Sequence, residues 1–298
     1  MHPLPKPTVT DQPAKPLAAE SAPKVDKRRA ARRFEAAVDT YDEAAVLQRT
    51  VADRLVGRLH VVRALPQDIL DAGCGTGYCT RLLSRRYRRA RVIGLDLVWR
   101  MAVAARRKGG WFSRARFVGG DAERLPFAAG TFDMVVSNFM LPWCDPALAL
   151  AEFLRVLRPD GLLVFTTLGP DTLTELRAAW RHADPEAQSH VFLDMHDVGD
   201  ALVRAGFVEP VMDVERYTLT YPDVDRLLRD LKALGAGSAL PPQRRGLVAR
   251  ARFERFRAAY APSPADGKLP ATCEVVFGHA WAPRGFAGDR RVIKIRSS

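Results

Sequence analysis

The 298-residue sequence predicts an α/β protein whose parallel sheet is covered by helices on both faces. From residue 68 to residue 205, short and almost continuously apolar segments alternate with longer segments of helical pattern. Such apolar strands are typical of parallel sheets that are buried on both sides. A glycine-rich turn at 73–77 joins the first strand to the first following helix, where an open sheet of this class binds its ligand.

The chain begins with a helical region and continues as alternating strands and helices. Apolar residues recur at helical spacing over 29–65, and Pro66 ends that region. A helix that stops before Pro159 leads through a turn at Asp160-Gly161 into the fifth strand. The sequence predicts strands at 68–72, 91–96, 115–119, 132–137 and 162–167, with helices at 77–87, 99–108, 146–157, 171–183 and 194–205.

The pattern changes after Gly206. Residues 208–219 alternate as a strand, and residues 272–280 form a second apolar run. A helical insert at 223–260 separates the two. Two late strands around an insert predict a hairpin added to one edge of the parallel sheet.

Composition and charge limit the classes of partner. The net charge of +12 and the isoelectric point near 10 predict acidic partners. Nucleic acid and an acidic carrier protein both fit, and so does an arginine-rich composition without such a partner. No apolar run approaches the about 18–20 residues of a membrane span, and the N-terminus has no secretory apolar segment. We therefore expect no contact with a membrane.

The cysteines indicate neither a metal site nor a disulfide framework. Cys74, Cys79, Cys144 and Cys273 are scattered without C-x-x-C spacing. This use of cysteine is typical of a reducing compartment, so we expect a cytoplasmic protein without bound metal.

The most informative motif is the turn after the first strand. The apolar run ends in Asp71, and glycines follow at 73, 75 and 77. Glycine accepts a positive φ and lets a ligand approach the backbone, and the start of the next helix favours an anionic or polar ligand group. The G-x-G-x-G spacing differs from the G-x-G-x-x-G of a pyrophosphate cradle, but the turn by itself leaves both kinds of cofactor open.

Acidic residues at further strand ends narrow the choice. Asp96 follows Gly77 by 19 residues and can accept hydrogen bonds from two ribose hydroxyls, or can simply cap its strand. Leu97 and Met101 can face an adenine ring or belong to the core. Asp121 follows the third strand, where its carboxylate can accept from an adenine amino group. Acids at three strand ends favour a cationic ligand such as S-adenosylmethionine.

These motifs resemble those of the class I S-adenosylmethionine-dependent methyltransferases over residues 66–168. The resemblance implies a seven-stranded sheet whose seventh strand is antiparallel. It implies that the turn from Gly73 to Gly77, with Asp71 and Cys74, holds the methionine portion of the cofactor. Asp96 would bind the ribose, Asp121 and Ala122 the adenine, and Asn138 would line the mouth near the methyl group. The residues that carry the resemblance are Leu70 to Gly77, Gly94 to Asp96, Gly120 to Ala122 and Phe132 to Asn138.

The flanking segments resemble a narrower family, the malonyl-acyl-carrier-protein O-methyltransferases of biotin synthesis, over about 29–282. Assembly factors of respiratory complex I that resemble arginine hydroxylases share the Gly169 to Leu176 pattern and the late strand, whereas the 41–48 segment favours the biotin enzymes. Other acceptors on the same fold remain alternatives. The segments that carry this resemblance are 33–37, 41–48, 51–52, 141–144, 165–176, 230–236 and 271–278.

The resemblance implies methyl transfer to the free carboxylate of malonyl-acyl-carrier protein or malonyl-coenzyme A. That carboxylate is ionised at neutral pH, so the reaction needs no general base, and we expect no catalytic acid–base residue. The segment Asn138-Phe139-Met140-Leu141 lacks the Asn-Pro-Pro-Tyr-like motif of nucleic-acid methyltransferases, so we expect no nucleic-acid partner.

The acceptor is expected to meet a lid made of the helices at 29–65 and the insert at 223–260. The candidates for acceptor contact are Tyr41, Gln48, Trp143 and Lys232. Tyr41 and Trp143 can equally be core residues and Lys232 a surface residue. Basic runs such as Lys27-Arg28-Arg29 can steer an acidic carrier protein. We expect a monomeric domain at 29–283, a disordered basic and proline-rich tail at 1–28, and a basic tail at 284–298.

Overall fold

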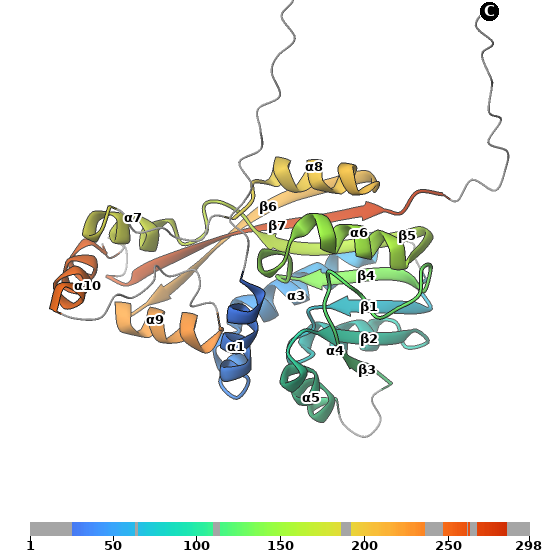
Figure 1. Cartoon of the computed structure of the whole chain (residues 1–298), viewed down its shortest axis with the longest axis horizontal. Helices are drawn as coiled ribbons and strands as arrows, with labels where there is room; N and C mark the ends of the chain where they lie inside the picture. The colour runs from blue at the N-terminus through green and yellow to red at the C-terminus, as the bar shows by residue number, and fades with distance from the viewer. Residues whose placement is uncertain are drawn as a thin grey trace, which may run out of the picture.

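A seven-stranded sheet in the order β3-β2-β1-β4-β5-β7-β6 forms the centre of the computed structural model (Figure 1). The model describes residues 26–62, 65–109, 114–185, 192–235, 247–260, 262 and 267–284. β7 runs antiparallel to both of its neighbours, while the other paired strands are parallel. The α/β class and the antiparallel seventh strand predicted from the sequence are confirmed. The strands are β1 (Asp68–Ala72), β2 (Arg91–Asp96), β3 (Arg116–Gly119), β4 (Phe132–Asn138), β5 (Leu157–Leu168), β6 (Val208–Tyr221) and β7 (Leu269–Trp281).

Helices cover both faces of the sheet because successive strand residues point to opposite sides. Ile69 and Met134 pack in one apolar cluster with α3 and α4, whereas Leu70 and Val135 pack in another with α6 and α8. The helices are α1 (Lys27–Ala37), α2 (Tyr41–Ala44), α3 (Val46–Arg58), η1 (Leu59–Val61), α4 (Tyr78–Arg86), α5 (Trp99–Lys108), η2 (Leu141–Trp143), α6 (Pro146–Val156), α7 (Thr174–Ala183), α8 (Met195–Ala205), α9 (Val224–Ala233) and α10 (Leu247–Ala259).

The first helix begins earlier than the sequence pattern predicts. The Asp26 side chain accepts a hydrogen bond from the Arg29 main-chain N–H at 3.0 Å and so caps α1, which starts at Lys27. Lys27 and Arg28 are therefore helical rather than part of a tail. The rest of the two predicted tails, at 1–25 and 285–298, lies outside the described residues.

The fifth strand also begins earlier than predicted. β5 starts at Leu157, which pairs with Phe132, and the pairing register then shifts before Met134 and Leu162. Asp160 has a φ of 60° within this irregular stretch. The predicted turn at Asp160-Gly161 is thus a bulge inside β5, because the chain regains its pairing with β4 instead of leaving the sheet.

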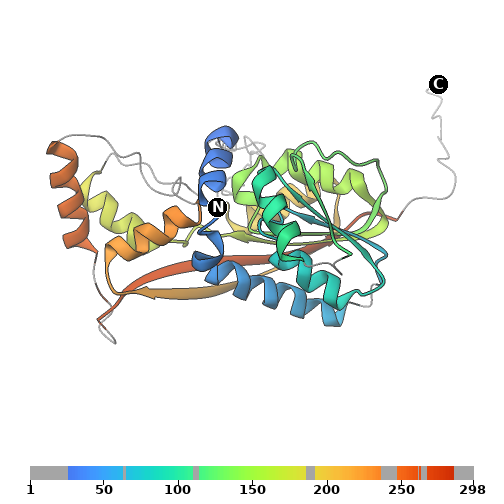
Figure 2. The same ribbon diagram turned by 90° about the horizontal axis from the view of Figure 1, so that it is seen from below.

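β6 and β7 extend past the other strands and carry a second apolar core. The pairing of β5 with β7 ends at Leu168 and Val275, whereas β6 and β7 remain paired as far as Leu269. Figure 1 shows α7, α9 and α10 around this extension, and Figure 2 shows it from below. Leu176, Leu227 and Phe256 from the three helices pack together there. Within the predicted insert, α9 contacts α1 and α2, whereas α10 packs against α7.

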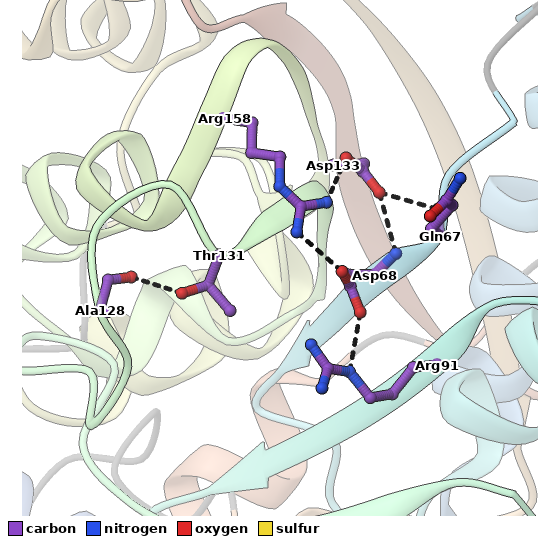
Figure 3. Close-up of polar contacts among 7 residues, drawn as sticks. All are labelled: Gln67, Asp68, Arg91, Ala128, Thr131, Asp133 and Arg158. Atoms are coloured by element: carbon purple, nitrogen blue, oxygen red, sulfur yellow. Dashed lines mark hydrogen bonds and ion pairs between the residues drawn. The ribbon is translucent and has the colours of Figure 1, made fainter.

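An ion-pair cluster joins the strands at the amino edge of the sheet (Figure 3). The Asp133 carboxylate accepts from the main-chain N–H groups of Gln67 and Asp68 at 2.8 and 2.9 Å. Arg158 bridges Asp133 at 2.6 Å and Asp68 at 2.8 Å, and Arg91 binds Asp68 at 2.7 Å. Burial by itself would raise the pKa of Asp133, but Arg158 and the two N–H donors lower it below its usual value. Asp133, although it lies in one of the sequence motifs, therefore stabilises the amino edge of the sheet, opposite the carboxyl ends of the strands.

Candidate functional site

A cavity of about 930 Å³, including its open mouth, lies at the carboxyl ends of β1, β2 and β4 beneath α1 and α2. We call it the first cavity. Most of the residues that the sequence singled out meet in its wall, although they come from separate elements. They are Gly73, Gly75, Asp96, Leu97, Met101, Asp121, Ala122 and Asn138, with Tyr41, Gln48 and Trp143.

The glycine turn forms one side of this cavity. Gly73 has a φ of 75° and Gly75 a φ of 52°, conformations that favour glycine. A Cβ atom on Gly73 would lie 2.5 Å from the side chain of Met140, a neighbour that the sequence analysis did not identify. Gly77, with a φ of 78°, directly precedes α4 as its N-cap and packs near Ala105. It lines neither the first cavity nor a smaller cavity beside the turn, which we call the turn cavity. Its place in the motif is thus explained by helix packing.

Asp96 is held at the cavity by two main-chain donors. Its Oδ2 accepts from the Gly75 N–H and its Oδ1 from the Val98 N–H, both at 2.8 Å. Each oxygen retains acceptor capacity for a ligand. Burial raises the pKa of Asp96 to about 6, against the lowering effect of the two N–H donors.

Asp71 does not reach the cavity, contrary to its predicted place in the cofactor site. It is 1% exposed, and its Oδ2 accepts from the Thr80 hydroxyl at 2.5 Å. Its Oδ1 is buried without a hydrogen-bond partner among the described residues. Burial, together with the nearby Asp96, raises the pKa of Asp71 to about 7, against the lowering effect of its hydrogen bonds with Thr80. Asp71 therefore lies beneath the turn as a buried carboxyl group.

Asp121 is paired with a cation that the sequence analysis placed in a surface run. The Lys27 Nζ lies 2.6 Å from Oδ2 of Asp121 and 2.6 Å from Oε2 of Glu123. The Glu123 N–H donates to Oδ1 of Asp121 at 2.9 Å. The signal that could have revealed Lys27 is Asp26, a capping residue directly before the helical pattern.

The apolar candidates differ in exposure. Leu97 is 46% exposed, Ala122 is 8% exposed and Met101 is 1% exposed. Met101 also packs with Val38 in a small cluster beneath α1, so its side chain belongs to the core as well as to the cavity wall.

Asn138 connects the end of β4 to α3. Its Nδ2 donates to the main-chain carbonyl of Gln48 at 3.1 Å, and its Oδ1 accepts from the Thr166 hydroxyl at 2.8 Å. The side-chain Oε1 of Gln48 is buried without a hydrogen-bond partner among the described residues. Gln48 lines both the first cavity and the smaller turn cavity. Tyr41 and Cys74 also line the turn cavity.

Tyr41 and Asp42 connect α2 to the glycine turn. The Asp42 Oδ1 accepts from the Thr76 hydroxyl at 2.5 Å. Burial raises the pKa of Tyr41 above its usual value, and Asp96 and Asp42 raise it further, so its phenol is neutral at physiological pH. Like the Lys27–Asp121 pair, the Asp42–Thr76 hydrogen bond joins an N-terminal helix to the cofactor site, and the sequence analysis did not identify it.

Trp143 separates the first cavity from an apolar cavity of about 730 Å³, and it lines both. Its ring lies edge-on to Phe34, with centroids 5.1 Å apart. Lys232 is exposed on α9 and lines none of the three cavities, so the structure does not support it as an acceptor-binding residue. Leu234, two residues further on, lines both the first and the apolar cavity.

Comparison with known proteins decides the family. Residues 70–165 match the family described as a methyltransferase domain. The malonyl-[acyl-carrier protein] O-methyltransferase of Methylovorus sp. is 50% identical over 267 residues, which cover 87% of this chain and 90% of that protein. The enzyme of the same name from Laribacter hongkongensis is 52% identical with the same coverage. This chain belongs to the malonyl-[acyl-carrier protein] O-methyltransferase family.

The family predicted from the flanking segments is thereby confirmed, and its methyl donor is S-adenosylmethionine. The solved structure of the YcgJ protein from Bacillus subtilis matches with a TM-score of 0.53 at 18% identity, covering 78% of this chain and 99% of that one. A likeness at this identity supports the fold alone.

The first cavity of this malonyl-[acyl-carrier protein] O-methyltransferase family member fits the donor chemically. Asp96 offers two oxygens to a ribose diol, and Leu97 and Ala122 offer an apolar surface to a base. Gly73 and Gly75 present backbone to the cavity, and a Cβ atom at Gly73 would meet the Met140 side chain at 2.5 Å. Together these groups suit a nucleoside with an attached amino acid.

Three further properties complete the description of this family member. Within the described ranges, no helix is both long and apolar enough to cross a membrane. Nor do three His, Cys, Asp or Glu side chains of the described part gather where they could hold a metal ion. His182 and His196 are exposed on α7 and α8, away from the cavities.

Proposed function

We propose that this chain transfers a methyl group from S-adenosylmethionine to the free carboxylate of malonyl-acyl-carrier protein, giving the methyl ester used in biotin synthesis. The anchored carboxylate of Asp96 in the wall of the first cavity is the observation that carries the donor assignment. The acceptor assignment is supported by relatives that are named for it and match most of the chain.

We assign the residues that line the first cavity and the turn cavity to the parts of the donor and the acceptor. Asp96 would bind the ribose hydroxyls, and Asp121 with Ala122, Leu97 and Met101 would surround the adenine. The turn residues Gly73, Cys74 and Gly75 would hold the methionine portion. Asn138, Gln48, Tyr41 and Trp143 would surround the methyl group and the acceptor carboxylate.

The proposed chemistry needs positioning rather than proton transfer. When bound, S-adenosylmethionine supplies an electrophilic methyl group to the ionised carboxylate oxygen and keeps the electron pair of the broken carbon–sulfur bond as a neutral thioether. The protein's part is to align the two reactants and to exclude water. Phe34 and Trp143, packed edge-on, form an aromatic wall suited to that exclusion.

The test is a direct assay with methyl-labelled S-adenosylmethionine and malonyl-acyl-carrier protein. We expect label in a base-labile ester on the carrier protein and none with acetyl-carrier protein, which lacks the free carboxylate. Malonyl-coenzyme A carries the same thioester arm without the carrier protein. Methylation of this second acceptor would show that the enzyme requires the arm but not the carrier. Cofactor binding without any methyl ester would contradict the proposal. Rescue of biotin-free growth in a host without its own malonyl methyltransferase tests the function in cells.

We further propose that the chain acts as a monomer in the cytoplasm and that the carrier protein is its macromolecular partner. A net charge of +12 suits an acidic partner. Light scattering of the purified protein tests the monomer, and a dimer at micromolar concentration would contradict it.

A further inference from the structure

The apolar cavity adjoins the first cavity through a shared wall. Both are lined by Gln48, Phe139, Trp143 and Leu234. Gln48 also lines the turn cavity, so its side chain stands where the three cavities meet. The two cavities are thus separated by these side chains, and a ligand that occupied both would have to pass beside Gln48 and Trp143.

The wall of the apolar cavity is uncharged. Its apolar lining includes residues of α2, α3, η2, α9, β6 and β7 with the end of β5, and no charged side chain among the described residues lines it. Two of its polar groups are held neutral. Burial raises the pKa of Tyr221 to about 12, and burial raises the pKa of Cys273 to about 12 as well. An ionised ligand group would lose its hydration there without finding a partner.

One side of this cavity is held rigidly by contacts across the chain. The Thr172 hydroxyl donates to the main-chain carbonyl of Glu274 at 3.1 Å, and the Leu173 N–H donates to the carbonyl of Thr272 at 2.6 Å. The Glu274 carboxylate accepts from the Asp171 N–H at 2.7 Å. Thr172 and Leu173 thus line a cavity whose shape exists before a ligand binds, as is usual for small-molecule sites.

We propose that the apolar cavity receives the uncharged pantetheine thioester arm of the acceptor. This inference rests on the proposed function, because it assigns the far end of the same acceptor. The acceptor carboxylate needs a compensating charge, which the described wall of the apolar cavity does not offer. The carboxylate therefore stays on the first-cavity side of Gln48, and the neutral arm extends past Trp143.

A consequence is selection against free dicarboxylic acids. Free malonate would bring a second carboxylate to the uncharged wall, whereas a thioester brings a neutral group and an arm. The cavity thus distinguishes a malonyl thioester from malonate by the cost of burying a charge, without a residue dedicated to the sulfur atom.

The first test compares acceptors on the wild-type protein. We expect the KM of malonyl-pantetheine to be at least tenfold lower than that of the S-methyl thioester of malonic acid, which has the same carboxylate and no arm. Equal KM values would overturn this assignment while leaving the proposed function intact. Absence of turnover with both compounds and with malonyl-carrier protein would instead overturn the proposed function, and this assignment with it.

The second test fills the cavity. Ala44 is half-buried and lines the apolar cavity but not the first, whereas Ala178 is exposed on α7 and lines neither. We expect Ala44→Phe to raise the KM of malonyl-pantetheine at least tenfold, with the Kd of S-adenosylmethionine changed less than twofold. The matched Ala178→Phe variant should leave both values unchanged. An unchanged KM in a folded Ala44→Phe protein would contradict the assignment.

Discussion

The ammonium group of Lys27 lies 2.6 Å from the Oδ2 atom of Asp121, so one cation attaches α1 to the loop after β3. The same ammonium group contacts Glu123 at 2.6 Å. Because Phe34 on α1 lines the first cavity, this pair joins the wall of the cavity to the acid that we assign to the adenine. Two segments 94 residues apart in the chain thereby close over one site.

We predict that Lys27→Met weakens S-adenosylmethionine binding by about two- to fivefold. The side chains of Lys27 and Asp121 are partly exposed, and an ion pair of this kind contributes roughly 0.2–1 kcal/mol. Isothermal titration calorimetry measures the change. Lys232→Met removes the same charge from the exposed side of α9 and should leave the affinity as it is. Equal affinities for the two variants would show that this ion pair does not contribute to cofactor binding.

Replacement of Asp96 tests the ribose assignment. Asp96→Ala removes an acceptor that two main-chain N–H groups hold in place, and we expect cofactor binding to weaken by about 1–3 kcal/mol. Asp200→Ala, on the exposed side of α8, is the matched control and should bind like the wild type. If Asp96→Ala bound the cofactor with wild-type affinity, the ribose would have to lie elsewhere.

Cofactor affinity is predicted to fall in acid. Burial raises the pKa of Asp96 to about 6, and ribose hydroxyls donate to the ionised form. Affinity should therefore be nearly constant above pH 7 and about tenfold lower at pH 5, where about a tenth of this carboxyl is ionised. Calorimetry between pH 7 and pH 5 measures the fall.

Two variants separate Asp96 from its neighbours in this titration. Tyr41 and Cys74 have raised pKa values and stay neutral over this range, whereas the pKa of Asp71 is about 7. In Asp71→Asn, cofactor affinity should still fall below pH 6, whereas in Asp96→Ala the affinity should no longer depend on pH in this range. A flat profile in the wild type would contradict the assignment.

Two glycines with similar backbone conformations should respond differently to alanine. Gly73 has a φ of 75° and Gly130 a φ of 62°, so each substitution introduces roughly 1–2 kcal/mol of backbone strain. A Cβ on Gly130 meets nothing within 4 Å, whereas one on Gly73 meets Met140 at 2.5 Å. We expect Gly73→Ala to weaken cofactor binding more than tenfold. Gly130→Ala should lower only the free energy of unfolding, measured by urea denaturation, and comparable loss of binding in both would contradict the turn's role.

The ion-pair cluster at the amino edge should affect stability without affecting binding. The pKa of Asp133 is depressed in the folded state, so its ionised form stabilises the fold above the ordinary carboxyl pKa, and this stability is lost as pH falls through the lower, folded value. Asp133→Asn should lower the free energy of unfolding at pH 7 by about 1–2 kcal/mol. The deficit should shrink below pH 4, and cofactor affinity should stay unchanged. A deficit independent of pH would show that the Asp133 charge contributes nothing.

Much of the fold and the donor side of the candidate site could be predicted from the sequence because the signals are local. Short apolar runs and the alternation at 208–219 predicted all seven strands, and Gly73, Gly75 and Asp96 stand next to strand ends that parallel pairing brings together. The errors arose where a distant segment decides the outcome. Pairing with β4 extends β5 through Asp160, and packing against Ala105 explains Gly77.

The sequence by itself determined the sheet, the glycine turn, the acids at the strand ends and the resemblance to the family, because each depends on residues close together in the chain. Only the tertiary structure decided that Lys27 pairs with Asp121, that Lys232 stays outside the cavities, and that Gln48 and Trp143 form a wall shared by two cavities. These relationships depend on how α1, α3 and α9 pack against the strand ends. Hydrophobic packing of that kind is not directional, so a local pattern does not specify which side chains it brings together.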